Sequence, residues 1–134
     1  MTGVEWRFGR FCRFSLVGFM GAALQLTLVS LLTKCFGVFR TTATLVAVEI
    51  TILHNFIWHE RFTWGNRGPT NSRQLAVRLW RFHAGNGLVS LIGNTMVMYC
   101  LVERLKAPVL PAAVGAIVLC SLANFLIADR WVFR

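Results

Sequence analysis

Residues 107–128 read APVLPAAVGAIVLCSLANFLIA, a run of 22 residues without a charged side chain. Each residue of a helix adds about 1.5 Å, so about 20 apolar residues cross the hydrocarbon core of a membrane. A strand of a membrane barrel needs only about 10 residues and alternates apolar with polar side chains, which this run does not do. The run therefore predicts a transmembrane helix.

Three further runs have the same character and carry a single charge between them, on Glu49. These runs are Phe14–Thr33, Thr41–Trp58 and Ala84–Val102. Inside a bilayer, only helices and closed barrels satisfy their own backbone hydrogen bonds. We therefore predict an all-α integral membrane protein with four transmembrane helices.

The composition of the whole chain excludes most other classes of protein. Charged residues form 14% of the 134 residues, against about 25% in a usual soluble domain, and the mean hydropathy is +0.61. The sequence has no Gly-rich phosphate loop, nucleophile elbow or metal-binding His/Cys spacing, so we expect no enzyme activity, catalytic residue, metal or cofactor. The net charge of +9 fits contact with membrane lipids better than with nucleic acid.

The positive charges are unevenly distributed around the four runs. Ten of the 14 Lys and Arg residues lie in the N-terminus, in the segment between the second and third runs, or in the C-terminus. With four spans, these segments share one side of the membrane, and the other side holds four positive residues. Because loops rich in Lys and Arg stay in the cytoplasm, we predict that both termini are cytoplasmic.

The chain contains an internal repeat. Residues 55–64 read NFIWHERFTW and residues 124–133 read NFLIADRWVF, so an exit pattern of Asn-Phe, an acid, Arg and aromatic residues returns after 69 positions. Near an offset of 68, Arg81-Phe82 stands before the third run as Arg13-Phe14 stands before the first. Each half holds two spans, so both halves insert the same way round.

We therefore predict two helical hairpins, arranged as parallel repeats in one four-helix bundle. The halves cover about residues 10–64 and 78–133 of a single domain, residues 1–134. A cytoplasmic linker joins them over about residues 59–83. From Asn71 to Phe82 its spacing predicts a short basic amphipathic helix that lies on an anionic membrane surface.

Gln25, Glu49 and Asn94 are polar residues that lie well inside the predicted spans. A carboxylate at this depth is costly unless it is protonated, paired or hydrated. We interpret Glu49 either as a proton, cation or head-group site, or as a structural carboxylate bonded within the bundle. Gln25 and Asn94 are related by the same offset of 69 and are typical of hydrogen bonds between helices.

Arginines mark the cytoplasmic end of every predicted span, and two asparagines lie just beneath them. A guanidinium can bind a phosphate through two parallel hydrogen bonds. We therefore consider a collar that binds the phosphate and attached polar group of a lipid, with ordinary anchoring at the membrane interface as the alternative. The six candidate residues are Arg13, Asn55, Arg61, Arg81, Asn124 and Arg130.

The opening Arg13-Phe14-Ser15-Leu16-Val17-Gly18, the four spans and the doubled exit pattern resemble the GtrA-like family over about residues 10–134. Phe62 stands where the pattern often has Trp, and the second opening, Arg81-Phe82-His83-Ala84, departs further from it. The family's functional positions carry over to Arg13, Asn55, Phe56, Arg61, Asn124, Phe125 and Arg130, and with the weakest support to Arg81.

The resemblance implies translocation of a polyprenyl-phosphate-linked sugar across the bacterial inner membrane, for cell-surface polysaccharide modification. It also implies a partner, a membrane glycosyltransferase that makes or uses the lipid-linked sugar. A bundle this thin has little interior, so a homodimer is a further expectation. One alternative is a non-transporting anchor or scaffold subunit for the glycosyltransferase. A small multidrug exporter is another, although an arginine collar would repel the cations that such exporters favour.

Overall fold

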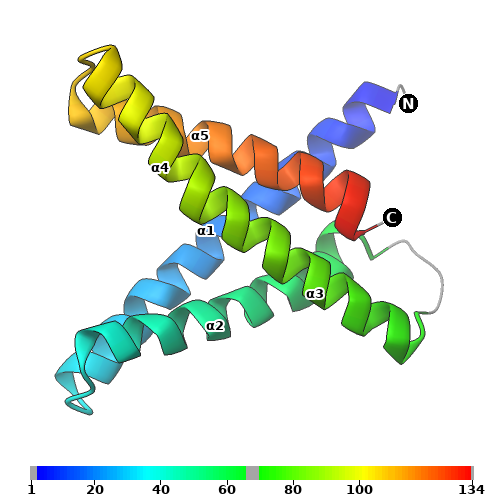
Figure 1. Ribbon diagram of the computed structural model, residues 1–134. Helices are drawn as coiled ribbons and strands as arrows, with labels where there is room; N and C mark the ends of the chain where they lie inside the picture. The colour runs from blue at the N-terminus through cyan, green and yellow to red at the C-terminus, as the bar shows by residue number, and fades with distance from the viewer. Residues whose placement is uncertain (1–2, 66–69, 134) are drawn as a thin grey trace. The chain divides into compact units, whose positions relative to one another are not determined.

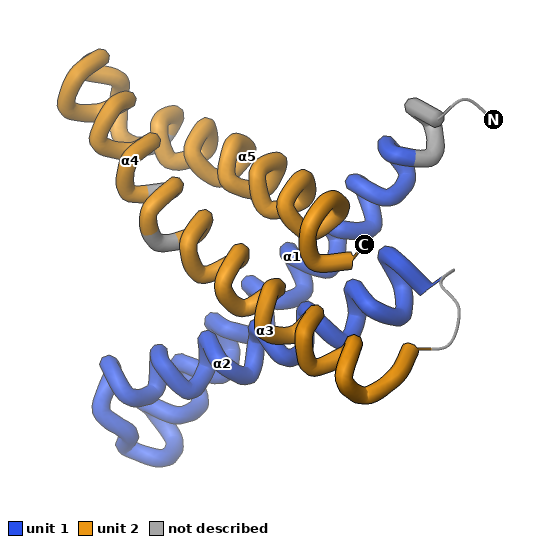
Figure 2. The backbone as a smooth tube through the Cα atoms, turned by 45° about the vertical axis from the view of Figure 1, so that its right-hand side comes forward, with its two compact units in different colours: residues 1–68 blue, residues 69–134 orange. Residues whose placement is uncertain are grey.

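The structure is a computed structural model that describes residues 3–65 and 70–133, apart from the side chains of residues 3–6, 91, 94 and 110. All regular elements in the described residues are helical, which confirms the predicted all-α class. The chain divides into two compact units, residues 1–68 and 69–134 (Figure 2).

Unit 1 is a single helical hairpin. Its first helix, α1, spans Gly3–Lys34, and its second, α2, spans Arg40–Trp58. The second helix continues without a break into a π-helical turn, η1, at His59–Thr63. The helices α1 and α2 lie side by side and run in opposite directions (Figure 1).

Unit 2 is also a hairpin, with one long arm and one shorter arm. The long arm is an unbroken helical run from Ser72 to Arg104. Its consecutive parts are α3 (Ser72–Leu88), η2 (Val89–Gly93), α4 (Asn94–Met98) and η3 (Tyr99–Arg104). The returning arm consists of α5 (Val109–Ile127) and η4 (Ala128–Val132), and it lies along α4 (Figure 1).

The long arm begins at a capping box on Asn71. Its side-chain oxygen accepts a hydrogen bond from the backbone N–H of Arg73 at 3.3 Å, and its own N–H donates to Gln74 Oε1 at 3.4 Å. The expected amphipathic helix is therefore present, but no helix end follows it at Phe82. The linker expected over about residues 59–83 thus contains η1 and the start of α3, and residues 66–69 lie outside the described part.

The two hairpins turn in the same way, 69 residues apart. Gly37 in unit 1 and Lys106 in unit 2 both have a left-handed backbone, with φ of 64° and 54°. After each of them, a backbone N–H closes the turn with a bond of 2.9 Å. The bonds run from Val38 N to Leu32 O and from Ala107 N to Leu101 O. The internal repeat of the sequence is thus also a repeat of backbone geometry.

A π-helical turn accounts for the shift of the repeat offset from 68 to 69. Arg13 pairs with Arg81 at an offset of 68, whereas Gln25 pairs with Asn94 at 69, so the second half contains one additional residue between these points. The π-helix η2 lies in this interval, whereas α1 is α-helical throughout. A π-turn encloses one more residue than an α-turn, so it absorbs the insertion without ending the helix.

Mostly small residues recur every four positions along the second arm of each hairpin, where they are buried or half-buried. Such residues allow two helix backbones to approach closely in a membrane protein. In unit 1 these positions are Ala43, Ala47, Thr51, Asn55, His59 and Thr63. In unit 2 they are Ala112, Ala116, Cys120, Asn124, Ala128 and Val132.

Among the described residues, three helices are long and apolar enough to cross a membrane, namely Arg7–Lys34, Arg40–Thr63 and Pro111–Val132. They contain the first two predicted spans and most of the last. The predicted third span, Ala84–Val102, lies within the helical run of unit 2 but is not one of these three. Large apolar side chains on the helix surfaces are well exposed, for example Phe19 at 76%. The chain is a multi-pass membrane protein.

Candidate functional site

In each unit, the arginine that precedes the first span contacts the exit segment, which is the π-helical turn at the end of the second arm. In unit 1, Arg13 on α1 lies over the ring of Phe62 in η1, with 5.4 Å from the guanidinium carbon to the ring centre. In unit 2, Arg81 on α3 lies over the ring of Trp131 in η4 at 5.8 Å. Such cation–π contacts contribute about 0.5–2 kcal/mol and hold a guanidinium in place.

The arginine of unit 2 has a second contact. Arg81 Nη1 donates a hydrogen bond to the backbone oxygen of Trp131 at 3.2 Å. A guanidinium carries five N–H donors in a planar fork, and this bond uses one of them. Arg81 is therefore oriented by a ring and a carbonyl group of the exit segment.

A buried histidine packs against Phe14, the neighbour of Arg13 in the sequence. His59 is 2% exposed, and its ring stacks on Phe14 with 4.6 Å between the centroids and 11° between the planes. Trp64 meets the same histidine edge-on at 5.6 Å, and Nδ1 of His59 lies 3.0 Å from the hydroxyl of Thr63. The end of unit 1 is thus a packed aromatic cluster with a polar centre.

The matching end of unit 2 is apolar. Phe82 and Phe133 pack together with 6.0 Å between their ring centres, and Phe133 is completely buried. The positions equivalent to His59 and Thr63 are Ala128 and Val132, both buried. Both halves thus place an arginine over an aromatic ring, an arrangement that we call the arginine–aromatic frame. They differ in the polarity of the buried residues at the same end of the hairpin.

The two predicted asparagines occupy equivalent positions with different surroundings. The side-chain oxygen of Asn55 lies 3.2 Å from Nδ1 of His54, and its amide packs against Gly21, where an added Cβ would overlap it. The side-chain oxygen of Asn124 is buried and has no hydrogen-bond partner among the described residues of the chain.

The other predicted polar positions are more scattered. Gln25 is half-buried on α1, and Glu49 is exposed on α2. Asn94 begins α4, but its side chain lies outside the described part. Arg61 and Arg130 are exposed on η1 and η4. Three of the six collar residues belong to each unit, so a ring that joins both units stays a prediction.

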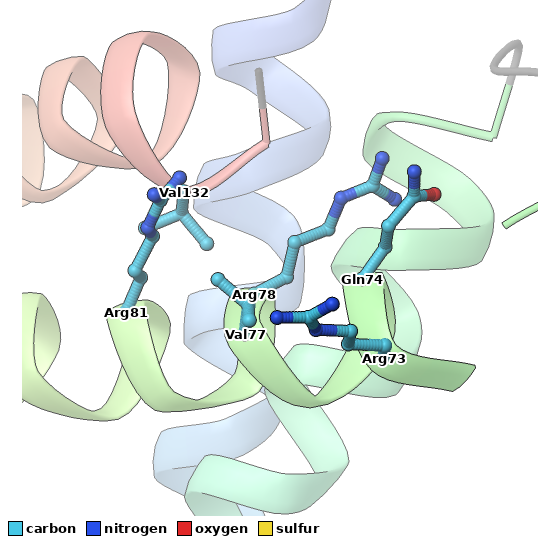
Figure 3. Close-up of a pocket in the computed structure, with 6 residues that line it drawn as sticks. All are labelled: Arg73, Gln74, Val77, Arg78, Arg81 and Val132. Atoms are coloured by element: carbon cyan, nitrogen blue, oxygen red, sulfur yellow. The ribbon is translucent and has the colours of Figure 1, made fainter. Parts of the chain in front are cut away.

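One pocket in unit 2 collects basic side chains, and it has a volume of about 250 Å³ (Figure 3). Arg73, Arg78 and Arg81 reach it from successive turns of α3, and Arg78 Nη1 donates to the hydroxyl of Thr70 at 3.2 Å. Val132, the last residue of a candidate span, forms part of the wall beside Arg81. Gln74 and Val77 also line the pocket.

Two arginines of this pocket were missing from the collar predicted from the sequence. Arg73 and Arg78 belong to the basic segment from Asn71 to Phe82, which the sequence predicts to lie on the membrane surface. Their spacing to Arg81, of eight and three residues, places all three within a 140° arc of one helix. What the sequence does not show is that the end of the chain returns to this arc and closes a pocket.

The described residues contain no group of three or more His, Cys, Asp or Glu placed to hold a metal ion. Guanidinium groups lie at the ends of apolar helices in both units. Such groups can recognise an anionic group attached to a membrane lipid.

Comparison with known proteins shows the family of the chain. A search of the curated proteins found no match. Residues 13–133 match the family described as "GtrA/DPMS, transmembrane domain". The match begins at the first arginine of the repeat and ends at the last buried phenylalanine, so it covers both hairpins. The chain belongs to the GtrA/DPMS transmembrane-domain family, whose membrane proteins are connected with polyprenyl-phosphate sugars.

Proposed function

We propose that this protein moves a polyprenyl-phosphate-linked sugar across the bacterial inner membrane without covalent chemistry. The observation that carries the proposal is the arginine fixed over an aromatic ring at the same end of each hairpin. Arg13 and Arg81 are held there by Phe62 and by Trp131. Aromatic residues and arginines favour the depth of the lipid head groups, where the phosphate of the lipid-linked sugar lies.

Movement of the sugar also needs polar groups deeper in the helices, because the hydrocarbon core does not solvate hydroxyl groups. The hydroxyl of Thr51 and the side-chain oxygen of Asn124 are buried, without hydrogen-bond partners in the described part of the chain. When the arms of a hairpin separate, these groups would bind sugar hydroxyls. The polyprenyl tail would remain in the surrounding lipid throughout.

The proposal includes a membrane topology. Ala84–Val102 would form the fourth span, so that both termini face the cytoplasm with most of the positive charge. The protein would work beside a membrane glycosyltransferase that makes or uses the lipid-linked sugar. Glu49 is exposed on α2 and would lie along the path of the sugar or against a partner.

The test is reconstitution of the purified protein in liposomes that contain a short-chain polyprenyl-phosphate sugar. The readout is the fraction of the sugar protected from a reagent that oxidises it from outside. We expect the protein to make the inner pool accessible faster than in protein-free liposomes, with no effect on a zwitterionic phospholipid. If the protein binds the lipid but the protected fraction does not change, the translocation proposal is wrong, and an anchor for a glycosyltransferase becomes the better account.

A further inference from the structure

The basic pocket of unit 2 has no counterpart in the sequence of unit 1. At the repeat offset of 68, Arg78 and Arg81 correspond to Arg10 and Arg13, but Arg73 corresponds to Glu5. The three positions therefore carry a formal charge of +3 in the second half and +1 in the first. Both halves have the arginine–aromatic frame, so the frame alone does not explain the additional charge.

The described lining of the pocket is strongly basic. Three guanidinium groups line one cavity, and none of the described residues that line it is acidic. Arg73 also lies in the first turn of α3, two residues after its cap at Asn71, where the helix dipole disfavours a positive charge. A bound anion would relieve both the mutual repulsion and the conflict with the dipole.

The size and the walls of the pocket restrict the ligand. A volume of about 250 Å³ lies below the range of about 300–1,000 Å³ that is usual for a drug-sized ligand, so it suits a phosphate group rather than the whole lipid-linked sugar. Val77 and Val132 add an apolar wall, and Val132 ends a candidate membrane span. A phosphate with an attached hydrocarbon chain therefore fits the pocket better than a free anion.

We propose that the second repeat alone binds the phosphate group of the lipid, between Arg73, Arg78 and Arg81. This inference deepens the proposed function and rests on it for the identity of the lipid. Arg81 is oriented by Trp131, and Arg78 by Thr70, so the two guanidinium groups are placed before the phosphate arrives. The two halves share one architecture, but only one of them carries the anion site.

The experiment measures binding of undecaprenyl phosphate to the purified full-length protein in detergent, by native mass spectrometry. Arg73→Gln with Arg78→Gln removes two charges from the pocket. Arg7→Gln with Arg10→Gln removes two charges from the first helix and is the matched control. We expect at least about a tenfold loss of affinity in the pocket variant and less than about a twofold loss in the control. Arg78→Lys should also weaken binding, because it keeps the charge but loses the fork.

Two further probes distinguish the source of the anion. Undecaprenol, which lacks the phosphate, should bind equally weakly to the wild type and to the pocket variant. Inorganic phosphate should compete only at concentrations far above those of the lipid. Equal losses of affinity in the two double variants would mean that the lipid binds to a diffuse basic surface and not to the pocket. Competition by inorganic phosphate at the concentration of the lipid would overturn the lipid assignment.

The failure of this inference is separable from the failure of the proposed function. If the wild type binds undecaprenyl phosphate through these arginines but does not move lipid-linked sugar in liposomes, the site stands and translocation is wrong. If the wild type moves the sugar and the pocket variant binds as well as the wild type, the site is wrong and translocation stands.

Discussion

Gly21 illustrates how one absent side chain positions a candidate site residue. It is buried on α1, and an added Cβ would overlap the amide of Asn55 on α2. The same amide contacts His54, so it cannot move aside without losing that bond. The close approach of the helices and the orientation of Asn55 therefore depend on each other.

We expect Gly21→Ala to lower the free energy of unfolding by about 1–3 kcal/mol, because the methyl group displaces the amide of Asn55. Gly18→Ala is the matched control, since a Cβ at Gly18 meets nothing within 4 Å. The measurement is denaturation in detergent. Asn55→Ala should recover most of the loss when it is added to Gly21→Ala. Equal effects of the two glycine variants would contradict the close approach.

His59 is the second residue that holds unit 1 together. Its ring fills the space between Phe14 and Trp64, and it is almost completely buried. We expect His59→Ala to destabilise the protein by about 3 kcal/mol, because it leaves a cavity and removes the partner of Thr63. His59→Phe keeps the stacked ring and should lose less. Unfolding midpoints in detergent compare the variants, and equal losses would show that the ring does not pack as described.

At the scale of the elements, the two hairpin turns share one backbone conformation but have different residues at the left-handed position. Gly37 adopts its left-handed conformation at no steric cost, whereas Lys106 bears a Cβ in the same conformation. A Cβ at Gly37 would meet nothing within 4 Å, so its conformation alone decides the cost. The repeat therefore provides its own control for strain in a turn.

We expect Lys106→Gly to raise the free energy of unfolding by about 1 kcal/mol and Gly37→Lys to lower it by about the same amount. The physical reason is the clash between Cβ and the backbone in the left-handed region. The measurement is thermal denaturation of the two single variants and of the double variant. The two single changes should have opposite effects on stability, and their effects should nearly cancel in the double variant. A loss of stability in Lys106→Gly would mean that the lysine side chain stabilises the turn by a contact that outweighs the strain.

Much of the architecture could be predicted from particular residues. The uncharged runs gave the helical class, and Asn55-Phe56 with Asn124-Phe125 revealed the repeat. The third span was predicted from its apolar run and lies within the helical run of unit 2, but it is not among the three membrane-crossing helices found in the described residues, so it stays a prediction. The π-helical turns could not be predicted, because the sequence shows an offset change of one residue but not how the helix absorbs it.

The candidate site was less accessible to sequence reasoning. Arg13 and Arg81 were identified from the repeat, because each precedes a span and has an aromatic residue behind it. Arg73 and Arg78 were assigned to the membrane surface, because an amphipathic pattern gives a polar face but not what returns to cover it. The contact of Asn55 with Gly21 depends on helix rotation, which no single sequence specifies.

At the scale of the whole molecule, the proposed topology makes a direct prediction. Variants that each keep a single cysteine, either Cys35 or one added at the C-terminus, are treated in intact cells with a membrane-impermeant maleimide. We expect Cys35, exposed at the first hairpin turn, to be labelled and the C-terminal cysteine to be protected. The opposite pattern would invert the orientation. Labelling of both cysteines would mean an odd number of spans.

The most direct test of the central claim compares translocation rates in liposomes loaded with a polyprenyl-phosphate sugar. The variants are Arg73→Gln with Arg78→Gln, and Arg7→Gln with Arg10→Gln, each reconstituted at the density of the wild type. If lipid-linked sugar moves through a phosphate site in the second repeat, the pocket variant should be slower by about tenfold or more, and the control should stay within about twofold of the wild type. Equal rates for the wild type and the pocket variant, or no movement by the wild type, would contradict the account.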